Sequence, residues 1–445
     1  MTAGDGGASN RPMAGTPAGL KGFSERRIIF LVGAVQFVNI LDFMMVMPMG
    51  PDFGRALGIS NAKLPMIGGA YTAAAAVSGI ICALFLDRFD RRKALAVAMA
   101  GLALGTLAGA FAVDLPSLMT ARIVAGIFGG PATSVALSII ADVIPPERRG
   151  RAMGAVMGAF SVASVLGVPM GLELARQLGW QAPFIVVAGL GALITAATFV
   201  MLPPLTLHLE ARAKEAHHVG FGELFGNRMV WWSYALTATV MMAGFVVIPS
   251  ISPYLQFNLH YPRKYIGLLY MAGGAVSFGA MRLVGWLVDR HGSFKIGAIG
   301  SLLLMPVVYV GFAVIIPGVP VVGVFIGFML AMSFRNVAYN TLVSKVPSPA
   351  ERARFMSVQS AVQHMASAIA AIMSSPLLHE LEDHSLRGMT NVAYVSIGLS
   401  ALVIPLLWAV ESKVRARARS AQRAEEQLAA AVALRGQALG GQQGG

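Results

Sequence analysis

Charged residues are scarce in this sequence. Asp, Glu, Lys and Arg make up 12% of the 445 residues, whereas a soluble domain has about 25%. Hydrophobic residues make up 56%, and apolar runs of about 18 or more residues, the length of a membrane-spanning helix, recur from near residue 28 to residue 410. The composition therefore excludes an ordinary soluble protein and indicates an all-α polytopic membrane protein.

Cysteine and catalytic motifs are also scarce. Cys82 is the single cysteine, so no intramolecular disulfide can form. His217 and His218 are adjacent, which is not the spacing of a metal site. No glycine-rich phosphate loop between a strand and a helix is present. We therefore expect no enzyme, no metal, no cofactor and no ATP-driven transport by this chain alone.

Twelve apolar runs predict twelve transmembrane helices. They cover residues 28–48, 64–86, 94–113, 118–143, 152–174, 183–202, 229–251, 266–288, 294–316, 319–343, 355–378 and 392–410. The predicted domains are a disordered tail (1–24), an N-terminal six-helix bundle (25–202), a linker (203–228), a C-terminal six-helix bundle (229–410) and a basic, low-complexity tail (411–445). The basic tail is either a solvated anchor or a helix that lies on anionic lipid.

Basic residues predict the orientation. Of the 34 Lys and Arg residues, 25 lie in the tails and in the loops after even-numbered spans, and six lie in the opposite loops. Because Lys and Arg favour the cytoplasmic side, both termini are predicted to be cytoplasmic. This distribution attributes the net charge of +13 to topology and not to nucleic-acid binding.

The two halves repeat one another. The segment "ALFLDRFDRRK" (83–93) returns as "GWLVDRHGSFK" (285–295), which places Asp289 202 residues after Asp87. A second pair, "PPERRGRAMG" and "PAERARFMS", places Arg354 203 residues after Arg151. Two matches at nearly one offset indicate a duplicated six-helix unit in parallel orientation, the architecture of transporters in which one bundle rocks against the other.

At these motifs the sequence resembles the major facilitator superfamily, and "LDFMMVMPMGP" (41–51) and "FMSVQSAVQHMA" (355–366) resemble the arabinose-efflux-permease-like subset of its drug:proton antiporter branch. The loop "GWLVDRHG" matches the family's G-x-L-x-D-R-x-G signature, and "LMTARIVAGIFGG" resembles the motif of its fourth span. Asp90 stands where the first copy of the loop has a turn glycine in the family. Aspartate tolerates a left-handed backbone better than most residues, so we expect the turn to survive.

The resemblance implies roles for the repeated loops and for span 5. The loops would latch a cytoplasmic gate, with Asp87 pairing with Arg91 near Asp142. The predicted gate residues are Asp87, Arg88, Arg91, Arg92, Asp142, Arg151, Gly285, Asp289, Arg290 and Gly292. The stretch "GAFSVASVLGVPMG" resembles the span-5 motif of the antiporter branch and would flex at Gly158, Gly167, Pro169 and Gly171.

Asp42 is the only carboxylate well inside a predicted span. Gln36, Asn39 and Asp42 lie three residues apart on one face of span 1, and lipid could not satisfy such a polar face. Arg122 on span 4 lies at a similar depth, counted at about 1.5 Å per residue. We predict that Asp42 carries protons and that Arg122 biases it, as the resemblance also implies for this arginine. A permanent structural ion pair is the alternative.

A second polar group is predicted in spans 10 and 11, where Arg335 and His364 match in depth. His364 is either a second proton site or substrate contact, or a hydrogen-bonded packing residue. The residues predicted to line a substrate cavity are Gln36, Asn39, Asp42, Arg122, Arg335, Asn336, Asn340 and Gln363.

The sequence therefore predicts proton-coupled efflux of small organic molecules across a bacterial inner membrane, by a monomer that uses the proton gradient. Proton symport for uptake and a non-transporting sensor or partner subunit are the alternatives. The identity of the substrate does not follow from the sequence.

Overall fold

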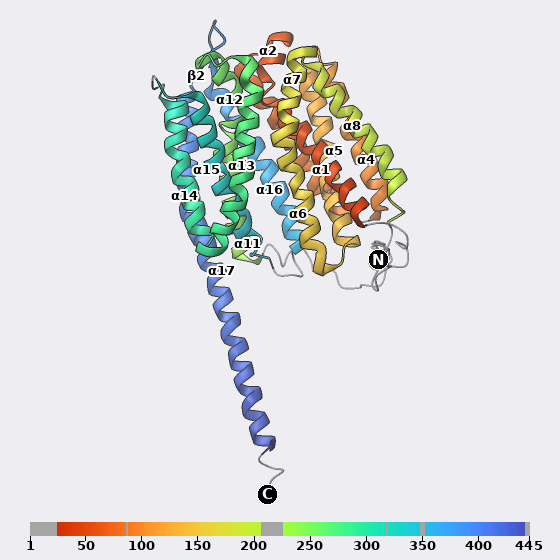
Figure 1. The fold of residues 1–445 in the computed structure, drawn as a ribbon, viewed down its shortest axis with the longest axis vertical. Helices are drawn as coiled ribbons and strands as arrows, with labels where there is room; N and C mark the ends of the chain where they lie inside the picture. The colour runs from red at the N-terminus through yellow and green to blue at the C-terminus, as the bar shows by residue number, and fades with distance from the viewer. Residues whose placement is uncertain are drawn as a thin grey trace, which may run out of the picture. The chain divides into compact units, whose positions relative to one another are not determined.

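Helices form nearly all of the structure, a computed structural model that describes residues 25–85, 88–205, 226–314, 316, 318–347 and 352–440 (Figure 1). In the first half they are α1 (Glu25–Val46), α2 (Gly50–Leu57), η2 (Asn61–Lys63), α3 (Leu64–Phe85), α4 (Arg91–Ala110), α5 (Leu115–Val143), α6 (Pro146–Val162), η4 (Ala163–Gly167), α7 (Val168–Leu178) and α8 (Gln181–Met201). In the second half they are α11 (Arg228–Phe245), α12 (Ile248–Pro253), η5 (Tyr254–Asn258), α13 (Arg263–His291), α14 (Ser293–Val308), η6 (Tyr309–Ala313), α15 (Val321–Val343), α16 (Arg352–Ser374), η7 (Ser375–Leu377) and α17 (Met389–Gly440). Two short strands, β1 (His379–Glu380) and β2 (Leu386–Arg387), pair before α17.

Within these described ranges, eleven helical stretches are long and apolar enough to cross a membrane. In lipid the backbone groups must bond to one another, which favours helices for such runs. The remaining predicted span, 355–378, is the helix α16, which is not among the eleven. It carries Gln359, Gln363 and His364, which lower its mean hydropathy.

The chain forms two compact units. Unit 1 comprises residues 1–218 together with Pro249–Gly274 and His379–Leu386. Unit 2 comprises Val219–Ile248, Ala275–Leu378 and Arg387–Gly445. Two segments of the second half of the chain therefore belong to unit 1. The domain boundaries at 202 and 229 stay a prediction.

In unit 1, α4 packs closely against α5. A Cβ atom on Gly105 would lie 2.5 Å from the backbone nitrogen of Ala125, so only glycine fits at this point of α4. Small residues at such positions let the backbones of membrane helices approach one another. α1 also packs against α5, and this brings its buried polar face against the same helix.

In unit 2, α14 packs against α15 in the same way. A Cβ atom on Gly300 would lie 2.6 Å from the backbone nitrogen of Arg335. Further contacts repeat as well, because α4 packs on α8 in unit 1 and α14 packs on α17 in unit 2. The internal repeat in the sequence is therefore also a repeat of helix packing.

The last helix is longer than the sequence predicts. The predicted span ends at residue 410 and a low-complexity tail follows, but α17 continues as one helix of 52 residues to Gly440 (Figure 1). Residues 421–440 are rich in Ala, Leu, Gln, Glu and Arg, which have high helix propensity.

Candidate functional site

A buried ion pair joins α1 to α5 in unit 1. Asp42 is fully buried and Arg122 is 1% exposed. Arg122 donates from Nη1 to Asp42 Oδ1 and from Nη2 to Asp42 Oδ2, both at 2.9 Å. This bidentate geometry joins two charge-assisted hydrogen bonds, which are stronger than bonds between neutral groups. Asp42 and Arg122, which the sequence predicts at a similar depth in the membrane, are thus in direct contact. Their role in proton coupling stays a prediction.

Two further side chains hold this ion pair in place. Thr106 on α4 donates to Asp42 Oδ1 at 2.7 Å. The guanidinium of Arg122 lies 4.6 Å from the ring centroid of Tyr71 on α3, within the range of a cation–π interaction. Both oxygens of Asp42 accept hydrogen bonds, and these bonds together with the charge of Arg122 favour the ionised carboxylate.

The polar face of α1 continues this network. Tyr71 donates through its hydroxyl to Asn39 Oδ1 at 2.7 Å. Asn39 in turn donates to the carbonyl of Gly129 on α5 at 2.7 Å. Gln36 is also buried. The face that three-residue spacing predicts is therefore buried, whereas its lining of a substrate cavity stays a prediction. Tyr71 and Thr106 were missed, because tyrosine and threonine are ordinary residues in apolar helices.

The second predicted polar group lies on α15 and α16 in unit 2. Arg335 is fully buried and His364 is half-buried. Gln363 donates to the hydroxyl of Tyr339 at 2.7 Å. Tyr339 follows Arg335 by four residues, the spacing of neighbours on one helix face, and this spacing could have identified it.

The two asparagines of this group lie on the same helix. Asn340 is exposed, and its side chain donates to the carbonyl of Asn336 at 2.9 Å. Asn336 is half-buried. The roles of both asparagines in substrate binding stay predictions.

At the first predicted gate loop, an ion pair joins α4 to α5. Arg91 Nε donates to Asp142 Oδ2 at 3.2 Å, which brings these two predicted gate residues together. Arg92 donates to the carbonyl of Leu202 at 3.2 Å, and Arg88 is exposed. Asp87 and the side chain of Arg151 lie outside the described residues, so their predicted roles remain predictions.

Asp90 does not adopt the left-handed turn that the sequence predicts. Its φ is −55°, and its side chain accepts from the backbone N–H of Arg92 as the N-cap of α4. It also accepts from the backbone N–H of Leu205 at 2.9 Å. The expectation of a left-handed turn was wrong because an aspartate at this position satisfies the free donors at the start of the helix.

The second gate loop keeps the left-handed turn. Gly292 has a φ of +89°, and a Cβ atom there would lie 2.8 Å from Glu411 Oε1. Glu411 on α17 accepts from the backbone N–H of Phe294 in the first turn of α14 and pairs with Arg415. Asp289 and Arg290 are exposed at the end of α13, Gly285 is half-buried in the same helix, and their gating role stays a prediction.

The predicted flexing stretch coincides with an irregular segment of the fifth span. The α-helix α6 gives way to the π-helical turn η4, which ends at Gly167, and α7 then begins with Pro169 in its first turn. A Cβ atom on Gly167 would lie 2.8 Å from Leu41 on α1. Gly158 lies before the π turn and Gly171 after it. π-helical turns are frequent at functional sites, and flexing at this turn stays a prediction.

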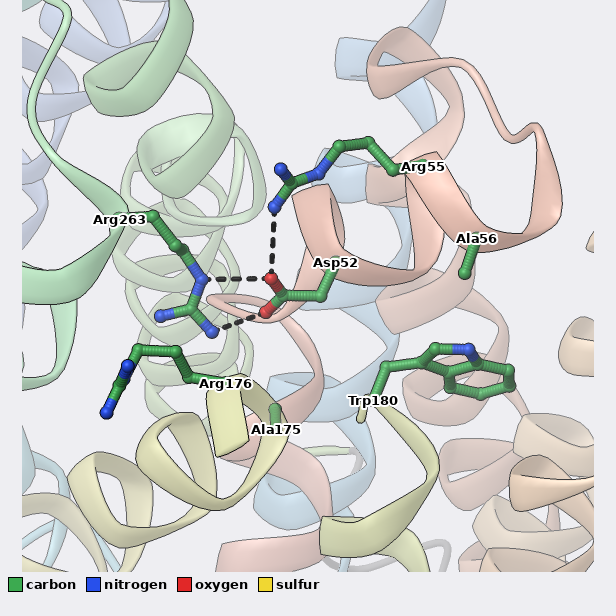
Figure 2. A pocket seen from close by; sticks show the side chains of 7 residues that line it. All are labelled: Asp52, Arg55, Ala56, Ala175, Arg176, Trp180 and Arg263. Carbon is green, nitrogen blue, oxygen red and sulfur yellow. Dashed lines mark hydrogen bonds and ion pairs between the residues drawn. The ribbon is translucent and has the colours of Figure 1, made fainter. Parts of the chain in front are cut away.

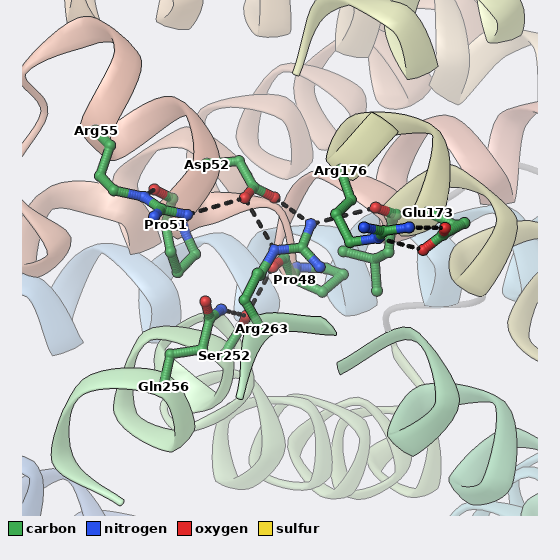
Figure 3. Close-up of polar contacts among 10 residues, drawn as sticks. Pro48, Pro51, Asp52, Arg55, Glu173, Arg176, Ser252, Gln256 and Arg263 are labelled. Carbon is green, nitrogen blue, oxygen red and sulfur yellow. Dashed lines mark hydrogen bonds and ion pairs between the residues drawn. The ribbon is translucent and has the colours of Figure 1, made fainter. Parts of the chain in front are cut away.

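A polar network that the sequence did not predict gathers around Asp52 on α2. Arg263 donates to Asp52 from Nε at 2.9 Å and from Nη2 at 2.5 Å, and also to the carbonyl of Leu172 (Figure 3). Ser252 on α12 donates to the carbonyl of Pro48 at 2.7 Å. We call these five residues the Asp52 network. It was missed because Asp52 and Arg263 are 211 residues apart and each lies in a short polar connection.

A cavity of about 450 Å³ opens beside this network. Figure 2 shows Asp52 held between Arg55 and Arg263, with Trp180 nearby. The residues that line the cavity are Asp52, Arg55, Ala56, Ala175, Arg176, Trp180 and Arg263.

A family model and named relatives match the sequence of this chain. The sequence model of the Major Facilitator Superfamily matches residues 32–371. The chain is 30% identical over 268 residues to the inner membrane transport protein YdhP of Escherichia coli K12, which covers 59% of this chain and 66% of YdhP, just under two thirds. It is 25% identical over 278 residues to a chloramphenicol resistance protein of Streptomyces lividans, which covers 62% of this chain and 70% of that protein.

Solved structures show the same fold at low sequence identity. A bacterial homologue of the human lysosomal transporter Spinster, in an inward-facing and occupied conformation, aligns with a TM-score of 0.70 at 15% identity, covering 87% of this chain and 97% of the other. A D-xylose–proton symporter aligns with a TM-score of 0.67 at 16% identity, covering 86% and 96%.

Proposed function

This chain belongs to the Major Facilitator Superfamily, whose members are membrane transporters and not enzymes, and we propose that it exports small organic molecules in exchange for protons. The proposed site of action is the bacterial inner membrane, with both termini in the cytoplasm. The chain would work as a monomer without a cofactor, with the proton gradient as its energy source.

The buried pair of Asp42 and Arg122 carries the proposal. A carboxylate inside a membrane span is costly, so such a residue is by default a candidate for function. The pair lies where α1, α3, α4 and α5 meet, and its partners come from each of these helices. A rearrangement of any one of these helices would therefore change the access of a proton to Asp42.

Alternating access can use this geometry in a simple cycle. When Arg122 withdraws from Asp42, the carboxylate takes up a proton; when Arg122 returns, the proton leaves toward the opposite side. The π-helical turn η4 lies beside α1, and a change in its winding would shift α1 relative to α5. Proton uptake and release would thus be linked to the movement of the helices.

The names of the relatives support export as the direction of transport. One relative is named an inner membrane transport protein and another a chloramphenicol resistance protein. A transporter that confers resistance does so most directly by removing the compound from the cell, which favours export over uptake for this chain as well.

The test uses everted membrane vesicles with an imposed proton gradient. A compound identified by growth protection of cells that express the chain is added, and proton efflux and compound uptake are recorded. We expect both in the wild type. In Asp42→Asn we expect loss of gradient-driven transport, while exchange of labelled for unlabelled compound without a gradient continues.

The matched control is Asp114→Asn. It makes the same change at an exposed carboxylate that caps α5, where asparagine also serves as a cap. Gradient-driven transport that survives in Asp42→Asn would overturn the role of Asp42. Protons and compound moving in the same direction would replace export with uptake, and no movement of either would favour a sensor.

A further inference from the structure

Arg335 on α15 is a buried charge that pairs with no carboxylate among the described residues. Its side chain is fully buried, and its Nη2 donates to the sulfur of Met332 at 2.9 Å. Among the residues that the structure describes, Nε and Nη1 of Arg335 have no hydrogen-bond partner. A thioether is a weak acceptor, so the positive charge of this guanidinium is poorly compensated.

The internal repeat relates Gly244, which lies beside Arg335, to an acid in the first half of the chain. The offset of 202 residues that relates Asp87 to Asp289 also relates Phe43 to Phe245 and Pro51 to Pro253. The same offset carries Asp42 onto Gly244. The second half of the chain therefore has a glycine at the position of this acid, whereas the offset carries Arg122 onto Val324, so Arg335 is a separate buried arginine.

The structure places this glycine directly opposite the arginine. Gly244 lies near the end of α11, and a Cβ atom built on it would lie 3.3 Å from Arg335 Nη2. The same Cβ would lie 2.9 Å from the terminal methyl of Met332, the flexible end of an adaptable side chain. Movement of Met332 would therefore free a place for a carboxylate against Arg335.

A buried charge that lacks its partner destabilises a protein unless a partner arrives. We propose that Arg335 binds the carboxylate of an organic acid carried by this transporter, on the side of the guanidinium that faces Gly244. This inference rests on the proposed transport function and assigns the class of its substrate. When no acid is bound, the sulfur of Met332 accepts the hydrogen bond from Arg335 Nη2. When the acid binds, Met332 moves aside.

The test measures thermal unfolding of the purified full chain in detergent with benzoate as the probe. Ligands that bind only the folded state raise the Tm. We expect benzoate to raise the Tm of the wild type in a concentration-dependent way, and benzamide, its uncharged counterpart, to leave it unchanged. The response should be lost in Arg335→Gln and kept in Arg282→Gln, which removes an exposed arginine from α13.

A second variant places a carboxylate directly beside Arg335. Gly244→Asp supplies a fixed carboxylate, which should raise the Tm without benzoate and remove the benzoate response. If Gly244→Asp fails to fold, Arg335→Gln still decides. The proposal is overturned if benzoate leaves the wild-type Tm unchanged, or if Arg335→Gln responds as the wild type does.

This measurement needs no proton gradient, so it separates the two proposals. A benzoate response that depends on Arg335, together with transport that does not depend on Asp42, would keep the acid site and reject proton coupling. Proton-driven transport without a benzoate response would do the reverse.

Discussion

Two buried arginines, one in each half of this chain, have opposite surroundings. Arg122 binds both oxygens of Asp42, whereas Arg335 donates to a methionine sulfur. A buried ion pair is weak evidence for stability, but the removal of one partner leaves an uncompensated charge. The two arginines should therefore respond differently to the same substitution.

We expect Arg122→Met to lower the free energy of unfolding by about 3–5 kcal/mol, because it leaves Asp42 buried without its partner. Arg335→Met should keep or raise the Tm, since it removes a charge that has no acid. Thermal unfolding in detergent measures both, and Arg282→Met is the exposed control. Equal losses at Arg122 and Arg335 would contradict the difference in pairing.

The sequence predicted the charged members of this site and not their neighbours. Asp42 and Arg122 stand out because a charge in an apolar run is rare. Thr106 does not stand out, and its contact with Asp42 depends on how α4 packs against α1. The lack of an acid beside Arg335 among the described residues was not predicted either, because the sequence does not show which side chains surround this arginine.

Among the helices, close packing repeats between the halves. Gly105 lets α4 approach α5, and Gly300 lets α14 approach α15. Apolar runs predict the helices well, because hydropathy is a local property of the sequence. The sequence could not predict the bond from the backbone N–H of Leu205 to Asp90, since these residues lie 115 positions apart.

We expect Gly105→Ala to lower the free energy of unfolding by about 1–3 kcal/mol, because the added methyl group forces apart two backbones. Gly189→Ala in α8 is the matched control, since nothing lies within 4 Å of its added Cβ. That control should be neutral or stabilising by up to about 1 kcal/mol, because alanine favours the helix. Similar unfolding midpoints for the two variants would show that α4 and α5 tolerate separation.

Across the whole molecule, distant parts of the sequence meet in unit 1. Glu380 accepts from the backbone N–H of Asn61 at 2.8 Å and from its side chain at 3.0 Å, and it pairs with His384. Burial raises the pKa of Glu380, but hydrogen bonds from Ser60, His384 and Asn61 outweigh it and hold this pKa below the ordinary value. The repeat and the family motifs predicted the fold, whereas this contact across 319 residues was not predictable from local patterns.

We expect Glu380→Gln to lower the free energy of unfolding by about 1–3 kcal/mol at neutral pH. The reason is that the substitution removes the negative charge and one of the two acceptor oxygens of the Glu380 carboxylate. Because folding lowers the pKa of Glu380, the stabilisation by its carboxylate is fully present above pH 4.5, the ordinary pKa. This stabilisation is lost as the pH falls through the lowered pKa of the folded state. The difference in Tm between wild type and variant should therefore shrink in acid. Glu382→Gln, at an exposed neighbour, is the control, and a difference that persists in acid would contradict the assignment.

Unit 1 is built from segments of both halves of the chain, and this affects the order in which its structure can form. Asp52 forms an ion pair with Arg263, and the backbone N–H of Asn61 donates to Glu380. The ribosome adds both of these partners much later in the chain. The first six spans can enter the membrane as they emerge, but unit 1 lacks part of its structure until residue 386 has been synthesised. During biogenesis, unit 1 can therefore be completed only after the second half of the chain has been synthesised. A nascent chain that stalls before residue 386 leaves unit 1 incomplete.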